Sequence, residues 1–408
     1  MENKMNLLKS KDFPHLPHCK ANHASVQHPV KFKLCTESLL SVPKSVIIDG
    51  IISYGGSTGI GLKLPCKAYG EFHERNHLFT RVALDQHKKL SEVHPEEHRE
   101  KLLSLCQLKN SDKQTCLNHQ FAFTTVHNIF DNSPYDYFYN AISLNCTKSD
   151  SKFINFSDSC ACASHPYKDK ALYNSLMEFI ERQALLGSWL SKSYQYTINP
   201  QLLREITPYE ELTDLLMENG ELFLFHNGNQ LPGHTVILFY FSHSQDDLVQ
   251  YSIGSSTGIT LEEAMLSAFE ELYQCYAFLY NSESSEGLEN KAGAGYHLEF
   301  QKCNTQSVRQ TIPFMQNIQP YHINTLSDLQ QVRKYTYEEV LDELSALSRD
   351  IYYYHAYDKS LGLHYTKILS PDFFAHMSLN NNLNIENKYA KSLNITAENA
   401  YMQKIPFP

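Results

Sequence analysis

Two short segments of the chain repeat one pattern of two glutamates followed by an arginine. The first, GEFHER, contains Glu71 and Glu74, and the second, MEFIER, contains Glu178 and Glu181. Residues three positions apart on a helix share a face, so each copy offers two carboxylates with an arginine beside them. Two such helices lying together would make a site with four carboxylates.

The apolar residues around both copies predict that the two helices bury the same face. In the first helix the apolar stripe consists of Ala68, Phe72, Phe79 and Ala83. In the second helix it consists of Leu172, Leu176, Phe179, Leu186 and Leu190. The glutamates lie to the same side of both stripes, so the two pairs of carboxylates should lean the same way.

A third segment, ITLEEAMLSAFEELYQCYAFLYN, repeats the plan in a weaker form, with Glu271 and Gln274 at the corresponding places and Cys275 instead of the arginine. Its apolar residues at helical spacing are Leu261, Met265, Ala268, Leu272, Cys275, Tyr276 and Leu279. Any single copy would be explained by an ion pair on a solvated helix face. Three copies in one register favour a shared site.

Composition excludes several classes of protein. The 408 residues carry a formal charge of −10, which argues against a nucleic-acid binder, and no apolar run is as long as the roughly 18 residues of a membrane span. The N-terminus lacks the apolar core of a signal peptide, so we expect a cytoplasmic protein whose ten cysteines are reduced. Cys160, Cys162 and His165 have zinc-like spacing, but the second ligand pair of a structural zinc site is missing.

Strand-like and helical segments alternate along the rest of the chain, which predicts a mixed α/β protein. Residues 1–45 are polar and proline-punctuated, typical of an arm or small cap, and Val46 begins the strand-like run VIIDGII. A glycine-rich turn, YGGSTGIG, follows; such a turn can cradle phosphate, although this one lacks the ending of a P-loop. Further strands are expected at 121–126, 136–145, 222–226, 235–241 and 351–357. Residues 85–120 and 336–349 have helical patterns, and 380–400 reads as a surface excursion.

The chain resembles the YcaO family, and within it the YcaO subunits of microcin-B-type thiazole/oxazole synthetases. The resemblance rests on GEFHERNHLF, DSCACASH with the helix into MEFIERQALLGSWL, the YSIG turn, YTKILSPDFFAHM and the terminal PFP. It implies a YcaO domain over 46–408, with repeated strand-helix units and a nucleotide site buried between the glutamate-bearing helices. It also implies an ATP-dependent cyclodehydratase that converts Ser, Thr or Cys residues of a precursor peptide into oxazolines and thiazolines.

The resemblance implies roles for individual residues. It makes the four glutamates of the repeated motif ligands of Mg²⁺: Glu71, Glu74, Glu178 and Glu181. It assigns to ATP binding Arg75, Ser164, Asn174, Arg182, Glu271 and Gln274. The family's C-terminus reaches towards the active site and assists cyclisation, which gives that role to Pro406, Phe407 and Pro408.

The chain departs from the family pattern near the nucleotide. Lys67 stands where many members have serine, Lys170 and Asn174 replace a glutamate and a glutamine, and Ser267 replaces an arginine. Family members act with a leader-binding partner related to ubiquitin-activating enzymes and with an FMN-dependent dehydrogenase that oxidises azolines. We therefore expect a hetero-oligomeric complex in which FMN belongs to another subunit.

Three alternatives remain open. The same ATP-dependent activation in YcaO proteins also yields thioamides or amidines, and the sequence does not reveal the nucleophile. The departures from the family pattern suggest a weakened scaffold that only docks the precursor, although both glutamate pairs and the PFP end argue against this. A carboxylate-bridged metal hydrolase would use similar glutamates, but such helices usually carry Glu-x-x-His.

Overall fold

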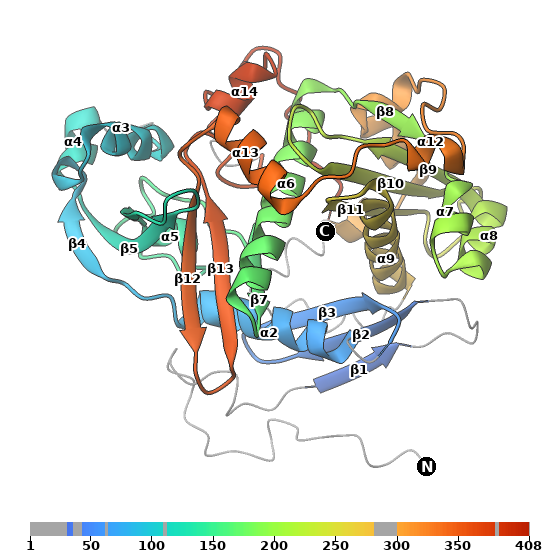
Figure 1. Ribbon diagram of the computed structural model, residues 1–408, viewed down its shortest axis with the longest axis horizontal. Helices are drawn as coiled ribbons and strands as arrows, with labels where there is room; N and C mark the ends of the chain where they lie inside the picture. The colour runs from blue at the N-terminus through green and yellow to red at the C-terminus, as the bar shows by residue number, and fades with distance from the viewer. Residues whose placement is uncertain are drawn as a thin grey trace.

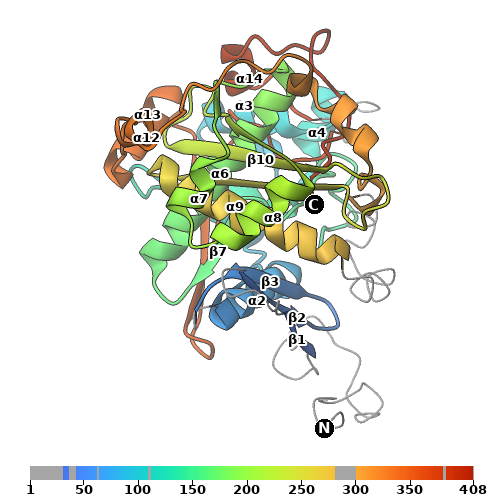
Figure 2. The same ribbon diagram turned by 90° about the vertical axis from the view of Figure 1, so that its right-hand side faces the viewer.

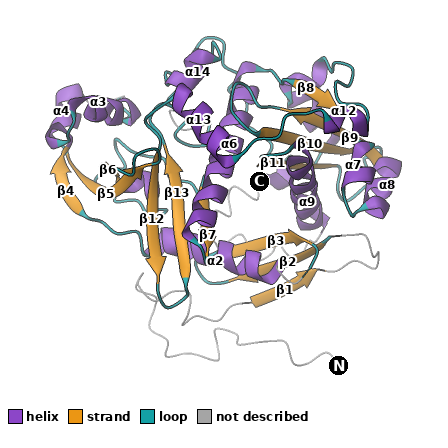
Figure 3. Ribbon diagram, viewed as in Figure 1, coloured by secondary structure: helices purple, strands orange, loops and turns teal. Residues whose placement is uncertain are grey.

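The computed structural model describes residues 31–35, 43–61, 64–108, 112–280, 300–379 and 383–407. It is a mixed α/β protein built on three antiparallel sheets, as the colouring by secondary structure in Figure 3 shows. Over the described part of the chain, no helix is long and apolar enough to cross a membrane.

The first sheet has three strands in the order β1-β2-β3 and carries helix α2 on one face. Its elements are β1 (Lys31–Cys35), β2 (Lys44–Asp49), β3 (Tyr54–Gly59) and α2 (Leu64–Thr80). In Figures 1 and 2 alike, this layer lies below α6 and α9. Because β1 pairs with β2, the predicted boundary at residue 45 falls inside a sheet, and the division into an arm and a YcaO domain stays a prediction.

The second sheet has the strand order β4-β5-β12-β13-β7, with β6 paired to β5. Its strands are β4 (Gln86–Lys89), β5 (Gln120–Asn128), β6 (Pro134–Phe138), β7 (Cys162–His165), β12 (Tyr352–Asp358) and β13 (Leu363–Leu369). The helices around it are η3 (Leu90–Glu92), α3 (Glu96–Leu105), α4 (Lys113–Asn118), α5 (Tyr139–Ile142), α13 (Tyr337–Leu347) and α14 (Lys388–Ser392). Helix α13 begins with a capping box between Thr336 and Glu339, as is typical of a helix N-terminus.

The third sheet has the order β11-β10-β9-β8, and β10 is buried along its whole length. Its strands are β8 (Tyr196–Ile198), β9 (Gly220–His226), β10 (His234–Ser242) and β11 (Tyr251–Gly258). The associated helices are α6 (Lys168–Ser191), α7 (Leu202–Ile206), α8 (Glu210–Asn219), α9 (Leu261–Tyr280), η4 (Gln306–Thr311), η5 (Pro313–Gln316) and α12 (Leu326–Gln330). Helix α6 lies between the second and third sheets and is buried along most of its length, so the largest core cluster forms around it.

Several predicted elements are confirmed. The structure has strands over 121–126, 222–226 and 235–241, a strand that begins at Tyr352, and a helix within 336–349. In α6 and α9 the predicted apolar stripes are largely buried, because these helices pack against strands on more than one side.

Other predictions of local structure are wrong. Both glycine-containing segments expected as turns, YGGSTGIG and YSIG, belong to strands, β3 and β11. Residues 136–145 divide into the end of β6 and the short helix α5, and 85–120 includes strand β4. Residues 380–400 include α14, whose Tyr389 is buried against α6 near Gly187.

The buried face of α2 also differs from the expected stripe. Ala68 and Phe72 are buried as predicted, but the helix ends at Thr80, so Ala83 lies beyond it and is exposed. The buried face instead includes the polar residues His73, Asn76 and His77. Burial lowers the pKa of His77 to about 3, so its ring is neutral where it stacks on Tyr365 and contacts the hydroxyl of Tyr354.

Candidate nucleotide and metal site

Each of the three glutamate-bearing helices follows a strand, and a backbone amide of that strand donates to one glutamate of the helix. The Gly56 amide of β3 donates to Glu71 at 2.6 Å, and the Ser255 amide of β11 donates to Glu271 at 2.6 Å. The third contact, from the Cys162 amide of β7 to Glu178, is 3.1 Å long. The donor and the glutamate lie 15 or 16 residues apart in every case, so the predicted threefold plan extends to the strands.

Glycine lets two of these strands approach their helices closely. A Cβ atom at Gly55 would lie 2.2 Å from the carbonyl oxygen of Ala68, and one at Gly254 would lie 2.1 Å from that of Ala268. No side chain fits at such distances, so glycine is required where the strand backbone presses on the helix. The equivalent position before the third amide is Ala161, which has a left-handed backbone with φ of 58°.

The arginines of the motif stay beside their own glutamates. Arg75 contacts Glu71 at 2.5 Å and lies over the ring of Tyr54, 4.2 Å from its centroid. Arg182 lies 3.5 Å from Glu178 and 3.4 Å from Glu181. The Nε atoms of both arginines are buried without a hydrogen-bond partner, so each guanidinium keeps a donor for another group.

The carboxylates of the three helices repel one another across the helix boundaries. Burial, followed by repulsion from Glu178 and Glu71, raises the pKa of Glu74 well above its usual range. Burial raises the pKa of Glu178 to about 7, with Glu181 adding to the effect, and it raises the pKa of Glu271 to about 8, again with a contribution from Glu181. Crowded buried acids of this kind favour binding of a cation.

Glu181 is joined to the third unit by Ser255. The Ser255 hydroxyl donates to Glu181 at 2.7 Å, while the amide of the same serine donates to Glu271. Burial raises the pKa of Glu181, and Arg182 and the Ser255 hydroxyl oppose that rise. One residue of β11 therefore positions carboxylates from both α6 and α9.

Within the described ranges, no group of three or more His, Cys, Asp and Glu side chains is arranged to hold a metal ion. A ready-made cage of four glutamates is thus not present. Mg²⁺ usually takes only one or two carboxylates and completes its octahedron with water and phosphate oxygens. The donors fit Mg²⁺ bound together with a nucleotide, and the assignment of the individual ligands stays a prediction.

The other residues predicted to bind ATP divide into two sets. Gln274 lies close to Gly56, and Ser164 lies close to Gly70 of α2, so both are at the contacts between the units. Asn174 is exposed on α6, one turn before Glu178. The departures from the family pattern are exposed as well, namely Lys67, Lys170 and Ser267.

The C-terminal segment runs along α6 to its arginine. Trp189 donates to the carbonyl of Gln403 at 2.6 Å, and Tyr251 donates to that of Pro406 at 2.6 Å. Phe407 is buried, and the Arg182 guanidinium lies 4.9 Å from the centre of its ring. Pro408 lies outside the described residues, and the catalytic role of the tail stays a prediction.

The sequence reasoning missed Lys367 of β13. Its side chain is buried, and its charge acts on both Glu74 and Glu178. A lysine in the middle of the apolar strand sequence YTKIL was the signal that could have identified it. Cys160 and Cys162 lie close by, and burial raises the pKa of both thiols.

A separate cavity of about 440 Å³ lies beside β8. It is lined by residues 192–197, 313, 314, 317, 319, 320 and 322 and contains none of the glutamates. The candidate site is therefore the contact region of α2, α6 and α9 rather than this cavity.

The chain is similar in sequence to known proteins. Residues 66–374 match the family model described as "YcaO cyclodehydratase, ATP-ad Mg2+-binding". The chain is 27% identical over 370 residues to the microcin B17-processing protein McbD of Escherichia coli, covering 88% of this chain and 91% of McbD.

Two solved structures show the same fold. A chain of the E. coli microcin synthetase McbBCD complex with pro-MccB17 bound matches with a TM-score of 0.81 at 24% identity, over 92% of this chain and 96% of that chain. YcaO from Methanopyrus kandleri, bound with AMPPCP and Mg²⁺, matches with a TM-score of 0.55 at 11% identity, over 85% of this chain and 86% of that chain. Because the family model spans well over half of its length, the chain belongs to the YcaO cyclodehydratase family.

Proposed function

We propose that this chain is the ATP-dependent subunit of an azole synthetase, which cyclises Ser, Thr or Cys residues of a ribosomally made precursor peptide to oxazolines or thiazolines for an azole-containing microcin. Its similarity to McbD supports this assignment. The observation that carries it is that a strand amide donates to one glutamate of each of α2, α6 and α9, namely Glu71, Glu178 and Glu271. These contacts hold carboxylates from three helices in one region.

The chemistry accounts for the residues in that region. The side-chain oxygen or sulfur of the substrate loses its proton and attacks the preceding amide carbonyl. The γ-phosphoryl group of ATP is then transferred to the resulting oxygen, and ADP leaves. The ring then forms its C=N bond with loss of the amide proton and departure of phosphate. Phosphoryl transfer requires aligned atoms and neutralised charge more than a protein nucleophile.

The residues of this chain would bind and orient the reactants. Glu71, Glu74, Glu178 and Glu181 would hold Mg²⁺, which supplies charge neutralisation at the phosphates when it is bound. The unpartnered Nε atoms of Arg75 and Arg182 remain available for phosphate oxygens. Ser164, Asn174, Glu271 and Gln274 would complete the nucleotide site.

The C-terminal tail would assist the attacking group. Phe407 lies against Arg182, so the end of the chain is next to one of the proposed nucleotide residues. Pro406, Phe407 and Pro408 would help to orient the attacking side chain of the substrate. Residues added after Pro408 should reduce cyclisation more than ATP binding; equal rates with and without the extension would count against a role for the tail.

The proposal includes a complex. We propose a cytoplasmic assembly with a leader-binding subunit related to ubiquitin-activating enzymes and a separate FMN-dependent dehydrogenase that oxidises the azolines. The domain proposed for this chemistry spans residues 46–408, and residues 1–45 would form an N-terminal arm or cap. This chain would supply the ATP and Mg²⁺ site.

The proposal is tested by mixing the chain with the synthetase subunits and the small peptide encoded beside it, together with ATP and MgCl₂. Released phosphate and peptide mass are followed together. We expect the peptide to lose the mass of one water per ring, coupled to ATP consumption.

Glu178→Gln should abolish both signals because it removes a carboxylate of the site without changing its shape. Glu221→Gln is the matched control, since Glu221 of β9 is exposed and forms an ion pair with Arg309. ATP turnover without loss of water would instead indicate a thioamide, an amidine or another backbone modification. Peptide binding without turnover would indicate a docking scaffold.

A further inference from the structure

Lys367 is a buried lysine next to the proposed metal site. It lies on β13, is 3% exposed, and pairs in register with Cys162 of β7. Its ammonium donates to the backbone carbonyl of Asp158 at 2.5 Å and lies 3.9 Å from the carboxylate of the same residue. A buried charge is costly unless it is paired and hydrogen-bonded, so this lysine and Asp158 form a structural unit.

Asp158 in turn fixes the turn that leads into β7. One of its carboxylate oxygens accepts the Cys160 amide and the other accepts the Met377 amide, both at 3.1 Å. The turn then passes through Ala161, whose φ of 58° is unfavourable for a residue with a Cβ atom. The Ala161 carbonyl accepts the Ile368 amide at 2.9 Å, which ties the turn to the residue after Lys367.

The residue after Ala161 makes the contact that the site depends on. The Cys162 amide donates to Glu178, as the amides of Gly56 and Ser255 do to the glutamates of the other two helices. In those two units a glycine before the donating amide lets the strand backbone press directly on its helix. The second unit has no glycine there and reaches the same contact through a left-handed turn held by two side chains.

Resting on the function proposed above, we propose that Lys367 and Asp158 are a pair of positioning residues. They hold the turn 158–162 so that the Cys162 amide keeps Glu178 oriented for a magnesium-bound nucleotide. The pair acts through the turn and does not touch the nucleotide. This requirement is specific to the α6 unit, because the α2 and α9 units use glycine instead.

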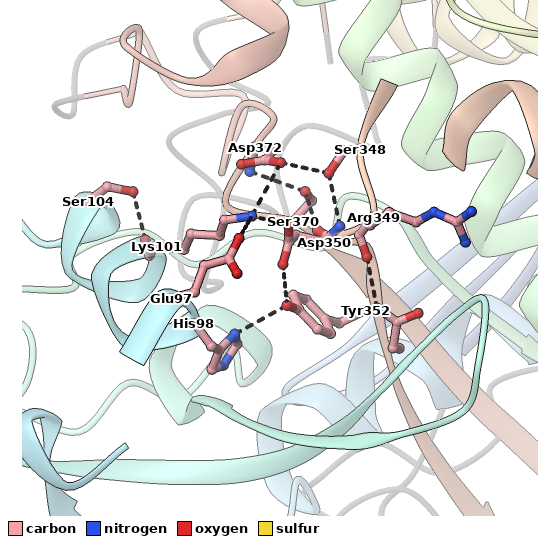
Figure 4. Close-up of polar contacts among 11 residues, drawn as sticks. Glu97, His98, Lys101, Ser104, Ser348, Arg349, Asp350, Tyr352, Ser370 and Asp372 are labelled. Atoms are coloured by element: carbon pink, nitrogen blue, oxygen red, sulfur yellow. Dashed lines mark hydrogen bonds and ion pairs between the residues drawn. The ribbon is translucent and has the colours of Figure 1, made fainter. Parts of the chain in front are cut away.

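The test uses the full chain assembled with its partner subunits and compares three variants. Lys367→Met removes the ammonium and keeps an unbranched apolar side chain, and Asp158→Ala removes the carboxylate that accepts the two amides. Lys101→Met is the matched control, because Lys101 on α3 is a partly buried lysine that also lies among carboxylates. These belong to Glu97, Asp350 and Asp372, and none of them is a proposed ligand (Figure 4).

Two measurements are made on each protein. Amide hydrogen exchange, followed by mass spectrometry, reports whether the peptide covering 158–165 is held in place. Binding of a fluorescent ATP analogue during a MgCl₂ titration reports the Mg²⁺ concentration at half-saturation. We expect both Lys367→Met and Asp158→Ala to speed exchange in 158–165 and to raise that Mg²⁺ concentration by about tenfold, the effect of losing one hydrogen bond to a charged group.

Lys101→Met should lower the melting temperature and change neither measurement. The effects of the two site variants should not add in the double variant, because both act on one turn. Faster exchange with an unchanged Mg²⁺ requirement would overturn the proposal, since the turn would then not serve the site. An altered Mg²⁺ requirement in Lys367→Met alone would also overturn it, because the lysine would then act directly, through its charge on Glu74 and Glu178 or through the nucleotide, and not through the turn.

If Lys367→Met does not fold, Asp158→Ala carries the same test. A wild-type complex that binds the analogue without any dependence on Mg²⁺ would contradict the proposed function. The exchange measurement would still show, separately, whether Lys367 and Asp158 hold the turn.

Discussion

Removing the Ser255 hydroxyl should shift the pH range in which the chain binds magnesium and nucleotide. Ser255 is buried, and its hydroxyl donates to Glu181 at 2.7 Å. A hydrogen bond to a charged group contributes about 1.5–3 kcal/mol, and this one lowers the pKa of Glu181, so its loss should raise that pKa further. Ser255→Ala keeps the backbone amide that holds Glu271, so the change is confined to Glu181.

The direction of the shift in pH follows from the protonation state of the carboxylate that binds the metal. A carboxylate binds Mg²⁺ only when it is ionised, and burial already raises the pKa of Glu181. Nucleotide binding should therefore weaken as pH falls through that pKa. In Ser255→Ala this acid limb should move to higher pH, so that nucleotide binding on the limb weakens by about tenfold or more and is recovered at alkaline pH.

The assay is the KM for ATP at a fixed, subsaturating concentration of MgCl₂, measured from pH 5.5 to 9 in the assembled synthetase. Ser252→Ala is the matched control, because Ser252 lies on the same strand, is equally buried, and donates to the Leu272 carbonyl rather than to a carboxylate. An acid limb that coincides with that of the wild type in Ser255→Ala would refute the reasoning. So would an equal shift in Ser252→Ala.

Three further predictions concern the other parts of the site. The raised pKa of Glu271 means that the folded state binds more protons than the unfolded state between about pH 5 and 8, so its free energy of unfolding should fall over that range by a few kcal/mol. Glu271→Gln should flatten this fall in urea denaturation at pH 5.5 and 8 without ATP, and an unchanged slope would contradict the assignment. Gly254→Ala should lower the free energy of unfolding by about 1–3 kcal/mol in the same assay and raise the Mg²⁺ concentration needed for nucleotide binding, because the added Cβ would lie 2.1 Å from the Ala268 carbonyl oxygen. Wild-type values for both quantities would be inconsistent with the close contact. Phe407→Ala removes the ring beside Arg182 and should slow ring formation, measured by peptide mass, more than it weakens binding of ATP; an equal loss in both would argue against a separate role for the tail.

The helices of the site were predictable from the sequence because their pattern is local. Glutamates three residues apart and apolar residues at helical spacing are visible along the chain, and α6 and α9 bury the residues that their patterns indicate. The stripe of α2 was less accurate, because His77 is buried against Tyr354 and Tyr365, which are far away in the sequence. Such burial depends on tertiary packing rather than on periodicity.

The strands of the site could not be predicted in the same way. Glycines in β3 and β11 suggested turns, yet Gly55 and Gly254 serve to bring a strand against a helix. Lys367 and Asp158 lie 209 residues apart, and no spacing along the chain indicates that they meet. The amides that hold the three glutamates are backbone groups, so the amino-acid sequence does not distinguish them.

The central claim is that the contact region of α2, α6 and α9 binds magnesium and ATP together. The most direct measurement is diffraction from crystals grown with Mn²⁺ and a non-hydrolysable ATP analogue, in which the anomalous signal locates the metal. We expect the metal beside the carboxylates of Glu74 and Glu178, with the phosphates of the nucleotide next to it. Metal and nucleotide in the cavity beside β8, or phosphates bound away from all three helices, would contradict it.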